Sequence, residues 1–154
     1  MHKALFCFVG WCLALSILLT GCSGQPLAEV KGTVTMAGKG IANVKVEFHP
    51  DPDKGTRGAG SSGTTDEQGN FSLTFTNGKP GAIVGHHRVV LSDLDVFGNV
   101  LVGRGDYRKD DDGKSSAEVP RKPRFADTYS DLAKPPFREE VKAGMGPVKF
   151  DIKK

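Results

Sequence analysis

The most reactive side chains of this 154-residue chain are its cysteines, and all three lie at its start. Cys7, Cys12 and Cys22 fall within the first 22 residues, and no cysteine follows. A cysteine thiolate is a nucleophile that forms disulfides, binds metals and accepts thioether-linked groups. Disulfide scaffolds carry paired cysteines through the folded body. The folded part of this chain must therefore be stable through burial alone, and the cysteine chemistry belongs to the leader.

The leader is organised like a secretory signal peptide. Met1-His2-Lys3 is a short positive region, and residues 4–19 form an almost wholly apolar run of 16 residues. A membrane-spanning helix needs about 20 apolar residues, so the length of the run favours a signal peptide. Cys7 and Cys12 are then apolar filler in a segment that is removed.

The end of the run, Leu19-Thr20-Gly21-Cys22, resembles the bacterial lipobox. In lipoproteins, a Leu and two small residues precede the Cys that becomes the first residue of the mature chain. The resemblance implies that the Cys22 thiol is diacylglycerylated, that residues 1–21 are removed and that the new amine is acylated. Two or more acyl chains give stable anchoring where one gives only marginal binding. The alternative is a plain signal peptide or a short anchor helix.

The residue after the lipobox bears on location. Ser23 follows Cys22, where the enterobacterial pattern for inner-membrane retention has an aspartate. The sequence therefore predicts a cell-envelope protein that faces an extracytoplasmic space, with the outer membrane favoured if the cell has one.

Two adjacent histidines are the first candidates for metal binding. His86 and His87 precede a predicted strand, so their rings point to opposite faces and cannot bind one metal ion from the same side. His87 is in phase with Val89 and Leu91, which favours a half-buried packing role. His49 is expected on the exposed face of its own strand.

Acidic stretches are the second candidates. Asp51-Pro52-Asp53-Lys54-Gly55 begins like a calcium loop, but Ser62 stands where the twelfth-position Glu is expected. Asp110-Asp111-Asp112 could supply oxygens, yet an acidic run between Lys109 and Lys114 is typical of a solvated loop. The sequence therefore predicts no metal ion and no cofactor.

The sequence offers little support for nucleotide binding or for catalysis. Residues 58–63, GAGSSG, match G-x-G-x-x-G, but a polar loop precedes them and a strand-like segment follows, whereas a dinucleotide site needs a strand before and a helix after. The chain has no G-x-S-x-G and no H-E-x-x-H, and no cysteine remains in the body as a nucleophile. We predict that the protein is not an enzyme.

Period-2 alternation of apolar residues dominates the body and predicts strands. In residues 44–50, Val44, Val46 and Phe48 share one face while polar residues occupy the other. The same pattern gives further inward-facing sets: Val30, Val34 and Met36; Phe71, Leu73 and Phe75; Val89 and Leu91. An Asp66-Glu67-Gln68-Gly69 turn is expected before Phe71.

The C-terminal part predicts one more pair of strands. Residues 137–142 and 148–153 are interpreted as a hairpin around Ala143-Gly144, with Val148, Phe150 and Ile152 facing inward. The total is about seven short strands without a convincing helical period. This pattern predicts an all-β fold, a single antiparallel Greek-key sandwich.

Composition supports a small globular body and excludes one class of partner. The chain has 38% hydrophobic and 25% charged residues, with 20 glycines and 9 prolines, which is typical of a turn-rich domain. Its formal net charge is only +3. Because nucleic-acid binding needs a clustered basic face, the sequence predicts no nucleic-acid partner.

Three stretches, in this order, carry a second resemblance: VKGTVTMAGKGIANVKVEFHP, TTDEQGNFSLT and PGAIVGHHRVVLS. They are similar to the carboxypeptidase regulatory-like, transthyretin-like (prealbumin-like) β-sandwich, and the chain resembles small bacterial lipoproteins in which this sandwich follows a lipobox. The resemblance covers residues 29–152 apart from an insert. It departs from the pattern at Gly40-Ile41, where Pro-Leu is common, and at His87, where an aromatic is usual. It implies an accessory or anchoring domain without catalytic residues.

The insert at about residues 93–122 is long and charged. Phe97, Val100 and Leu101 lie around a Gly98-Asn99 turn, which predicts an extra hairpin whose tip is a possible contact surface. The alternative is that these side chains cover the end of the sandwich. PRKPR, residues 120–124, adds a basic extended stretch.

The resulting organisation is a signal peptide at 1–21, a lipidated Cys22 and tether at 22–28, and a transthyretin-like sandwich at 29–153. We predict a membrane-anchored envelope lipoprotein whose sandwich is a non-enzymatic structural or interaction module. The membrane is its partner through the lipid anchor, and an envelope protein or a glycan is a possible further partner. The alternative is an extracytoplasmic module that binds a glycan or a calcium ion through loops at one end of the sandwich.

Overall fold

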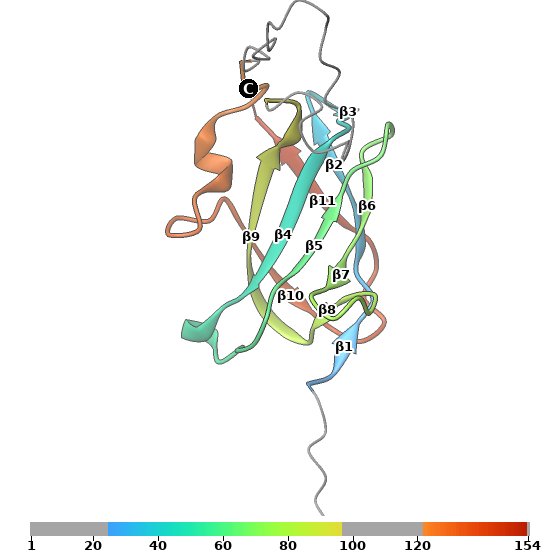
Figure 1. Ribbon diagram of the computed structural model, residues 1–154, viewed down its shortest axis with the longest axis vertical. Coiled ribbons are helices and arrows are strands. Elements are labelled where there is room, and N and C mark those ends of the chain that lie inside the picture. Colours follow the sequence, from blue (N-terminus) through green and yellow to red (C-terminus); the bar gives the residue numbers. More distant parts are fainter. Residues whose placement is uncertain (1–24, 97–121, 154) are drawn as a thin grey trace, which may run out of the picture.

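A computed structural model describes residues 25–96 and 122–153 of the chain (Figure 1). The described part is built from strands and short 3-10 turns, among them η1 (Pro52–Lys54) and η3 (Asp127–Ser130). Eleven strands are present in these residues, and seven of them have three residues or more. The prediction of an all-β fold is confirmed for this part of the chain, whereas the strands number eleven where about seven were predicted, since four of them have only two residues.

The larger sheet has five strands in the order β10-β9-β4-β5-β7, and every neighbouring pair is antiparallel. Its strands are β4 (Val44–Pro50), β5 (Ser61–Thr64), β7 (Thr74–Phe75), β9 (Gly85–Asp93) and β10 (Phe137–Val141). β10 pairs only with the first half of β9, Gly85 to Val89. The segment that carries η3 contacts β9 and lies beside its second half (Figure 1).

The second sheet faces the first across the core. β2 (Lys31–Met36) is its central strand and pairs with β3 (Lys39–Gly40), β6 (Asn70–Ser72) and β11 (Val148–Ile152). β11 runs parallel to β2, whereas the other described pairs are antiparallel. A two-residue ladder, β1 (Leu27–Ala28) with β8 (Ala82–Ile83), joins the start of the described chain to this framework.

The predicted C-terminal hairpin is wrong. β10 and β11 follow each other in the chain, but β10 pairs with β9 in one sheet and β11 with β2 in the other. The turn between them therefore crosses from sheet to sheet. Because both strands point their apolar residues at the same core, alternation alone cannot distinguish this arrangement from a hairpin.

The core lies between the two sheets and contains the residues that alternation assigned to it. Val44, Val46 and Phe48 are fully buried, and so are most of the other predicted inward residues. Phe150 from β11 contacts three rings, with centroid distances of 6.1 Å to Phe48, 6.1 Å to Phe71 and 4.9 Å to Phe137. Aromatic pairs at such distances stabilise a core beyond the area they bury.

One glycine permits this close packing. A Cβ on Gly32, in β2, would lie 2.8 Å from the Phe71 ring and 2.4 Å from the Val148 carbonyl oxygen. Any larger residue would push β6 or β11 away from β2. The predicted turn before Phe71 is also present, and Gly69 occupies its left-handed position with φ 82°.

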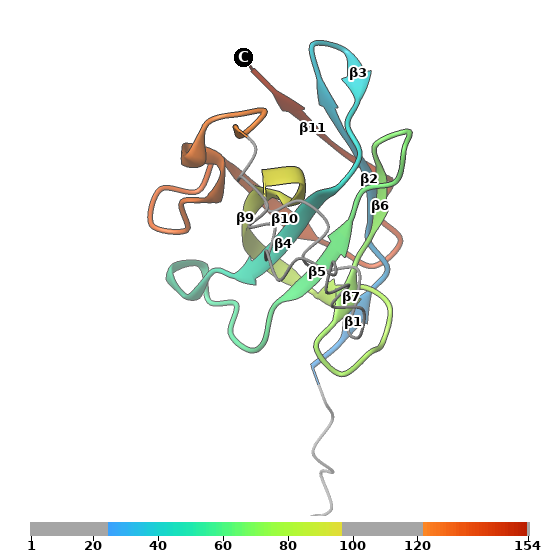
Figure 2. The ribbon, with the colours of Figure 1, turned by 45° about the horizontal axis from the view of Figure 1, so that its top comes forward.

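The two segments outside the described residues leave the body at opposite ends of its long axis. The described chain begins at β1, at the lower end in Figures 1 and 2. β9 ends at the upper end in Figure 1, where the chain on both sides of residues 97–121 is found and where the C-terminus also lies. We call these the tether end and the insert end. Leu27 and Ala28, predicted as tether, already belong to the folded body as β1.

Candidate functional site at the insert end

The residues that the sequence singled out as functional lie outside the described residues. They are the lipobox, Leu19, Thr20, Gly21 and Cys22, and the predicted contact surface, Phe97, Val100 and Leu101. The structure does describe where both segments join the body. These junctions are Gln25 at the tether end, and Val96 and Lys122 at the insert end.

An arginine–aspartate pair closes the base of the insert. Asp93 is the last residue of β9, and its side chain is only 4% exposed. Arg124, just after the insert, donates from Nε to Asp93 Oδ1 at 3.0 Å and to Oδ2 at 3.1 Å, and its Nη2 also contacts Oδ1. The Arg124 backbone N–H donates to Asp93 Oδ2 at 2.9 Å. Charge-assisted, multidentate contacts of this kind are among the strongest protein hydrogen bonds.

Arg124 also binds the loop before β4. Its Nη2 donates to the Ala42 carbonyl oxygen at 2.9 Å, and its Nη1 lies 2.9 Å from Asp95 Oδ2. Asn43, which has a left-handed φ of 56°, donates from Nδ2 to Asp95 Oδ1 at 3.0 Å. Asparagine tolerates that conformation better than most residues. The two ends of the insert and the β3–β4 loop are thus joined through one guanidinium group.

The electrostatics of this pair keep Asp93 ionised. Burial raises the pKa of the carboxyl, but the hydrogen bonds and the positive charge of Arg124 outweigh it and hold the pKa below the ordinary value of 3.8. Both members of the pair are therefore charged at neutral pH. Without Arg124, burial would favour the neutral form of the Asp93 carboxyl.

A cavity of about 200 Å³ lies beside the pair. Leu91, Val96, Pro123 and Phe125 give it an apolar wall, and Ser92, Asp93, Ala126, Asp127 and Ser130 complete the lining. Phe125 packs edge-to-face on Tyr129 with 5.6 Å between ring centroids. The Tyr129 hydroxyl accepts a hydrogen bond from the Lys153 backbone at 2.9 Å. The chain that leaves the insert is therefore packed against the sandwich.

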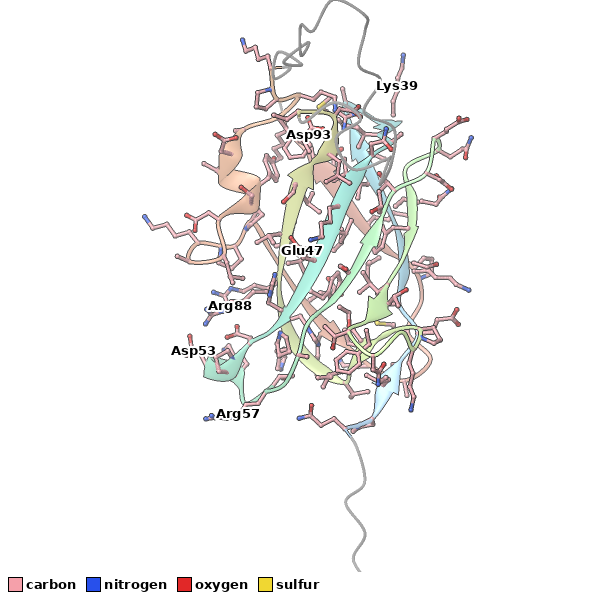
Figure 3. The ribbon with its side chains drawn as sticks, in the orientation of Figure 1. Lys39, Glu47, Asp53, Arg57, Arg88 and Asp93 are labelled. Atoms are coloured by element: carbon pink, nitrogen blue, oxygen red, sulfur yellow. The ribbon has the colours of Figure 1, made fainter. Side chains whose placement is uncertain are left out.

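A second buried aspartate lies nearer the tether end, in the segment that begins like a calcium loop. Asp51 is 1% exposed and accepts hydrogen bonds from Arg88 Nε at 3.0 Å and from Arg138 Nη1. Arg88 also reaches Asp53 at 2.6 Å; Figure 3 shows the two side chains together. Burial raises the pKa of Asp51, but its contacts with both arginines lower it overall. Its oxygens bind guanidinium groups, so this carboxylate stabilises the fold in the way that Asp93 does.

His86 and His87 point to opposite faces, as predicted, although His87 is more buried than expected, and His49 is half-buried rather than exposed. His86 is exposed, and His87, on the opposite face, is 1% exposed beside the ring of Phe48. His87 Nε2 is 2.7 Å from the Ile83 carbonyl oxygen, and Nδ1 has no partner in the described part. Burial lowers the pKa of His87 below its ordinary 6.5, so the ring is neutral at pH 7.

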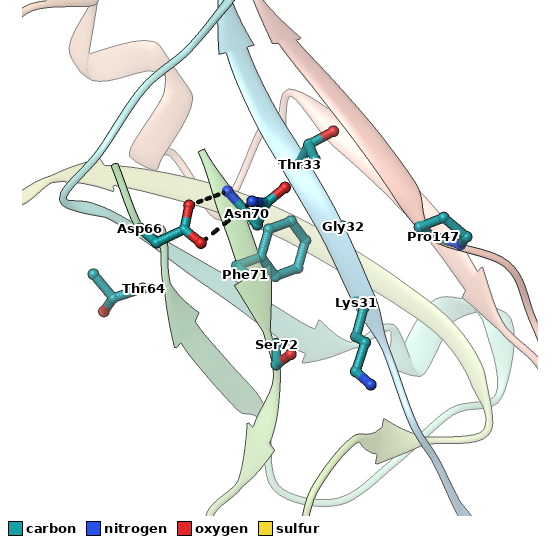
Figure 4. Close-up of a pocket in the computed structure, with 9 residues that line it drawn as sticks. All are labelled: Lys31, Gly32, Thr33, Thr64, Asp66, Asn70, Phe71, Ser72 and Pro147. Carbon is teal, nitrogen blue, oxygen red and sulfur yellow. Dashed lines mark hydrogen bonds between the residues drawn. The ribbon is translucent and has the colours of Figure 1, made fainter. Parts of the chain in front are cut away.

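A surface groove with a volume of about 520 Å³ lies on the outer side of β2 and β6 (Figure 4). Lys31, Thr33, Thr64 and Ser72 offer it polar groups, and the buried Phe71 lies at its floor. Asp66, at its rim, accepts hydrogen bonds from the Asn70 backbone at 2.8 Å and side chain at 3.2 Å. These bonds stabilise the turn and hold the pKa of Asp66 below its ordinary value.

Sequence reasoning missed both arginine–aspartate pairs. The sequence pattern places Asp93 at the start of a charged insert, Arg124 in a basic extended stretch and Asp51 at the start of a calcium-like loop. A useful signal exists at the two ends of the insert, where opposite charges lie close to core residues: Asp93 two positions after Leu91, and Arg124 directly before Phe125. Sequence spacing alone does not show that the two ends meet.

Comparison of the chain with protein-family models, curated proteins and solved structures returns no match. Within residues 25–96 and 122–153, no helix is long and apolar enough to cross a membrane. The same residues contain no cluster of three or more side chains of the types that bind metal ions. The site assignment therefore rests on the geometry described above.

Proposed function

We propose that this protein is an envelope lipoprotein, anchored through lipid on Cys22, whose β-sandwich presents its insert end as a non-enzymatic interaction module. One structural observation carries the proposal. The chain enters the body at β1, and the insert leaves it at the opposite end of the long axis (Figure 1). A lipid at Cys22 therefore puts the insert end farthest from the membrane, where a partner in the envelope can reach it.

The non-enzymatic part of the proposal is supported by what the buried charges do. Asp51 and Asp93 are the charged residues among the buried polar side chains of the described part, and arginine side chains neutralise both. Groups engaged in this way stabilise the native fold, whereas catalytic groups need access to substrate. The resemblance to carboxypeptidase regulatory-like domains points to the same accessory role.

For the fold itself, we propose the transthyretin-like Greek-key form of the sandwich. Its support is the order of the three family-like stretches along the sequence, together with the two facing sheets of the described residues. The parallel pairing of β11 with β2 is the feature that a solved structure should test first.

Labelling and fractionation test the anchor. Cells expressing the wild-type protein and Cys22→Ala are fed a labelled fatty acid and then separated into membrane and soluble fractions. We expect label and membrane association in the wild type, and loss of the label with retention of the uncleaved leader in the variant. A wild-type protein without label would overturn the lipoprotein proposal.

Capture of partners tests the interaction module. A tagged, lipidated protein is crosslinked in the envelope and compared with a variant in which a short glycine linker replaces residues 97–121. We expect envelope proteins captured by the wild type to be absent from the variant, with an unchanged melting temperature. The matched control is Lys149→Gln, an exposed change on β11. Identical partners in all three samples would contradict the proposal.

A second candidate function is glycan binding in the groove of Figure 4, because hydroxyl, amide and ammonium groups line it. Cell-envelope glycan fragments added to the labelled protein should then shift the amide signals of Thr33, Asn70 and Ser72 in NMR spectra. Unchanged signals at millimolar glycan would exclude this function.

A further inference from the structure

The structure places a set of unpaired basic side chains at the end of the body where the chain leaves for Cys22. Gln25 is the first described residue, and its side-chain amide donates to the Arg57 carbonyl oxygen at 2.9 Å. The 55–60 loop is therefore in direct contact with the start of the tether. Figure 3 shows Arg57 at the level of the lower end of β1.

Two further cations belong to neighbouring turns. Lys54 ends η1, three residues before Arg57. Lys79 lies in the β7–β8 turn, which passes next to β1 because Gly81 packs on the Ala28 carbonyl (Figures 1 and 2). All three side chains belong to exposed residues, and none has a carboxylate within 4 Å among the described residues. We call Lys54, Arg57 and Lys79 the tether-end surface.

Several acidic residues at this end are already neutralised. Glu29 is 2.7 Å from Lys31, Asp53 is 2.6 Å from Arg88, and Glu140 is 2.8 Å from Lys142. The opposite end carries acidic residues in its turns: Asp66, Glu67 and Asp95. Exposed cations, Lys39, Lys122 and Lys153, also lie at that end, so the two ends differ in that acidic side chains unpaired within the described part accompany the basic ones at the insert end.

The length of the tether limits how far the tether-end surface can lie from the membrane. Only three peptide units separate Cys22 from Gln25, which is at most about 11 Å of chain. A lipid on Cys22 enters the bilayer at the level of the glycerol groups, so the body cannot move far from the headgroups. A tether of this length allows the tether-end surface to come within one Debye length of the lipid phosphates, which is about 8 Å at physiological salt.

We propose that the tether-end surface docks on anionic phospholipid headgroups, so that the body stands on the membrane with its insert end outward. This inference rests on the proposed lipidation of Cys22 and extends it from an anchor to a fixed orientation. Basic residues close to an anionic surface each strengthen docking about fivefold, so the three together strengthen it on the order of a hundredfold.

The test measures hydrogen exchange in the full lipidated protein on vesicles of phosphatidylcholine, with or without phosphatidylglycerol. We expect phosphatidylglycerol to slow exchange in residues 52–60 and 76–81, and about 1 M salt to abolish the effect because screening then acts within about 3 Å. The triple variant Lys54→Gln, Arg57→Gln, Lys79→Gln should lose the effect. Its side chains make no ion pair in the described part, so folding should be unaffected.

A charge-matched variant separates a docking surface from a general charge effect. Lys39→Gln, Lys122→Gln, Lys153→Gln removes three exposed cations from the insert end and should keep the response. Equal responses of the two triple variants, or no response of the wild type to phosphatidylglycerol, would overturn the docking surface and leave the lipoprotein proposal intact.

Lipidation is read separately by mass spectrometry of the same sample. Unmodified Cys22 would overturn the proposed function, and the surface is then tested with residues 22–154 carrying Cys22→Ser and an N-terminal hexahistidine bound to nickel-chelating lipid. With this artificial anchor, phosphatidylglycerol should slow hydrogen exchange in the unsubstituted protein and in the insert-end variant. Loss of this slowing in the tether-end variant alone supports docking through the tether-end surface. Exchange that is independent of phosphatidylglycerol overturns it.

Discussion

At the tether end, backbone hydrogen bonds of β1 and β8 attach the chain to the body, and one exposed side-chain bond from Gln25 adds to them. At the insert end, the ion pair between the buried Asp93 and Arg124 attaches the two ends of a long insert to the body. The two attachments differ in their physical basis. Backbone pairing tolerates changes of side chain, whereas a buried carboxylate depends on its particular partner.

The two kinds of attachment match what the tether and the insert each require. Under the proposed lipidation of Cys22, the tether needs only a fixed point of attachment to the body, and the two-residue ladder of β1 with β8 supplies it. The insert departs and returns some thirty residues apart in sequence, so its two ends must be joined in space. Arg124 joins them while also contacting Ala42 and Asp95. Side-chain substitutions should therefore disturb the insert end more than the tether end.

The largest effect is expected from Arg124→Ala. It leaves Asp93 buried without its positive partner, and breaking a partly buried pair of this kind lowers the free energy of unfolding by about 3 kcal/mol. Urea unfolding followed by far-ultraviolet circular dichroism measures this loss in the free energy of unfolding. Arg124→Lys keeps the charge without the fork geometry and should lose less. A loss below about 1 kcal/mol for Arg124→Ala would place this pair among ordinary surface salt bridges.

A smaller effect is expected at Asp51, which has two arginine partners where Asp93 has one. Arg88→Gln and Arg138→Gln should each lower the melting temperature less than Arg124→Ala, because the other arginine still neutralises the carboxylate. The double variant should lose more than the sum of the two single losses. Strict additivity in this double-mutant cycle would show that the two arginines do not share Asp51.

The third prediction concerns pH. The pKa of His87 is lowered in the folded state, so the unfolded chain binds more protons between the folded pKa and about 6.5. Stability should therefore fall as the pH drops below 6.5, well above the range where Asp51 and Asp93 protonate. Melting temperatures of the wild type and His87→Gln, measured from pH 7.5 down to about pH 5, test this. The variant should show a flatter profile, and parallel profiles would refute the assignment.

The smallest effect is expected from Gln25→Ala at the tether end. The variant removes one exposed hydrogen bond to a carbonyl oxygen, which is worth about 1 kcal/mol or less. Arg57→Gln is the matched control, because it leaves that carbonyl oxygen in place and should not change stability. A loss in Gln25→Ala as large as in Arg124→Ala would remove the contrast between the two ends.

Alternation predicted most of what faces the core. Val44, Val46, Phe48, Val148, Phe150 and Ile152 all point inward as expected, because burying one face of a strand fixes which residues alternate. Alternation says nothing about which strand is the neighbour. For this reason β10 and β11, predicted as a hairpin, separate into different sheets although their inward faces were assigned correctly.

The lipobox-like end of the leader, the absence of cysteine from the body and the strand pattern are properties of short stretches, so the sequence alone determined them. Three features needed the tertiary structure: the parallel contact of β11 with β2, the pairing of Asp93 with Arg124, and the placement of tether and insert at opposite ends. Each depends on how segments far apart in the chain are arranged in space. Local patterns encode the conformation and exposure of a segment, but which segments meet depends on packing the whole core at once.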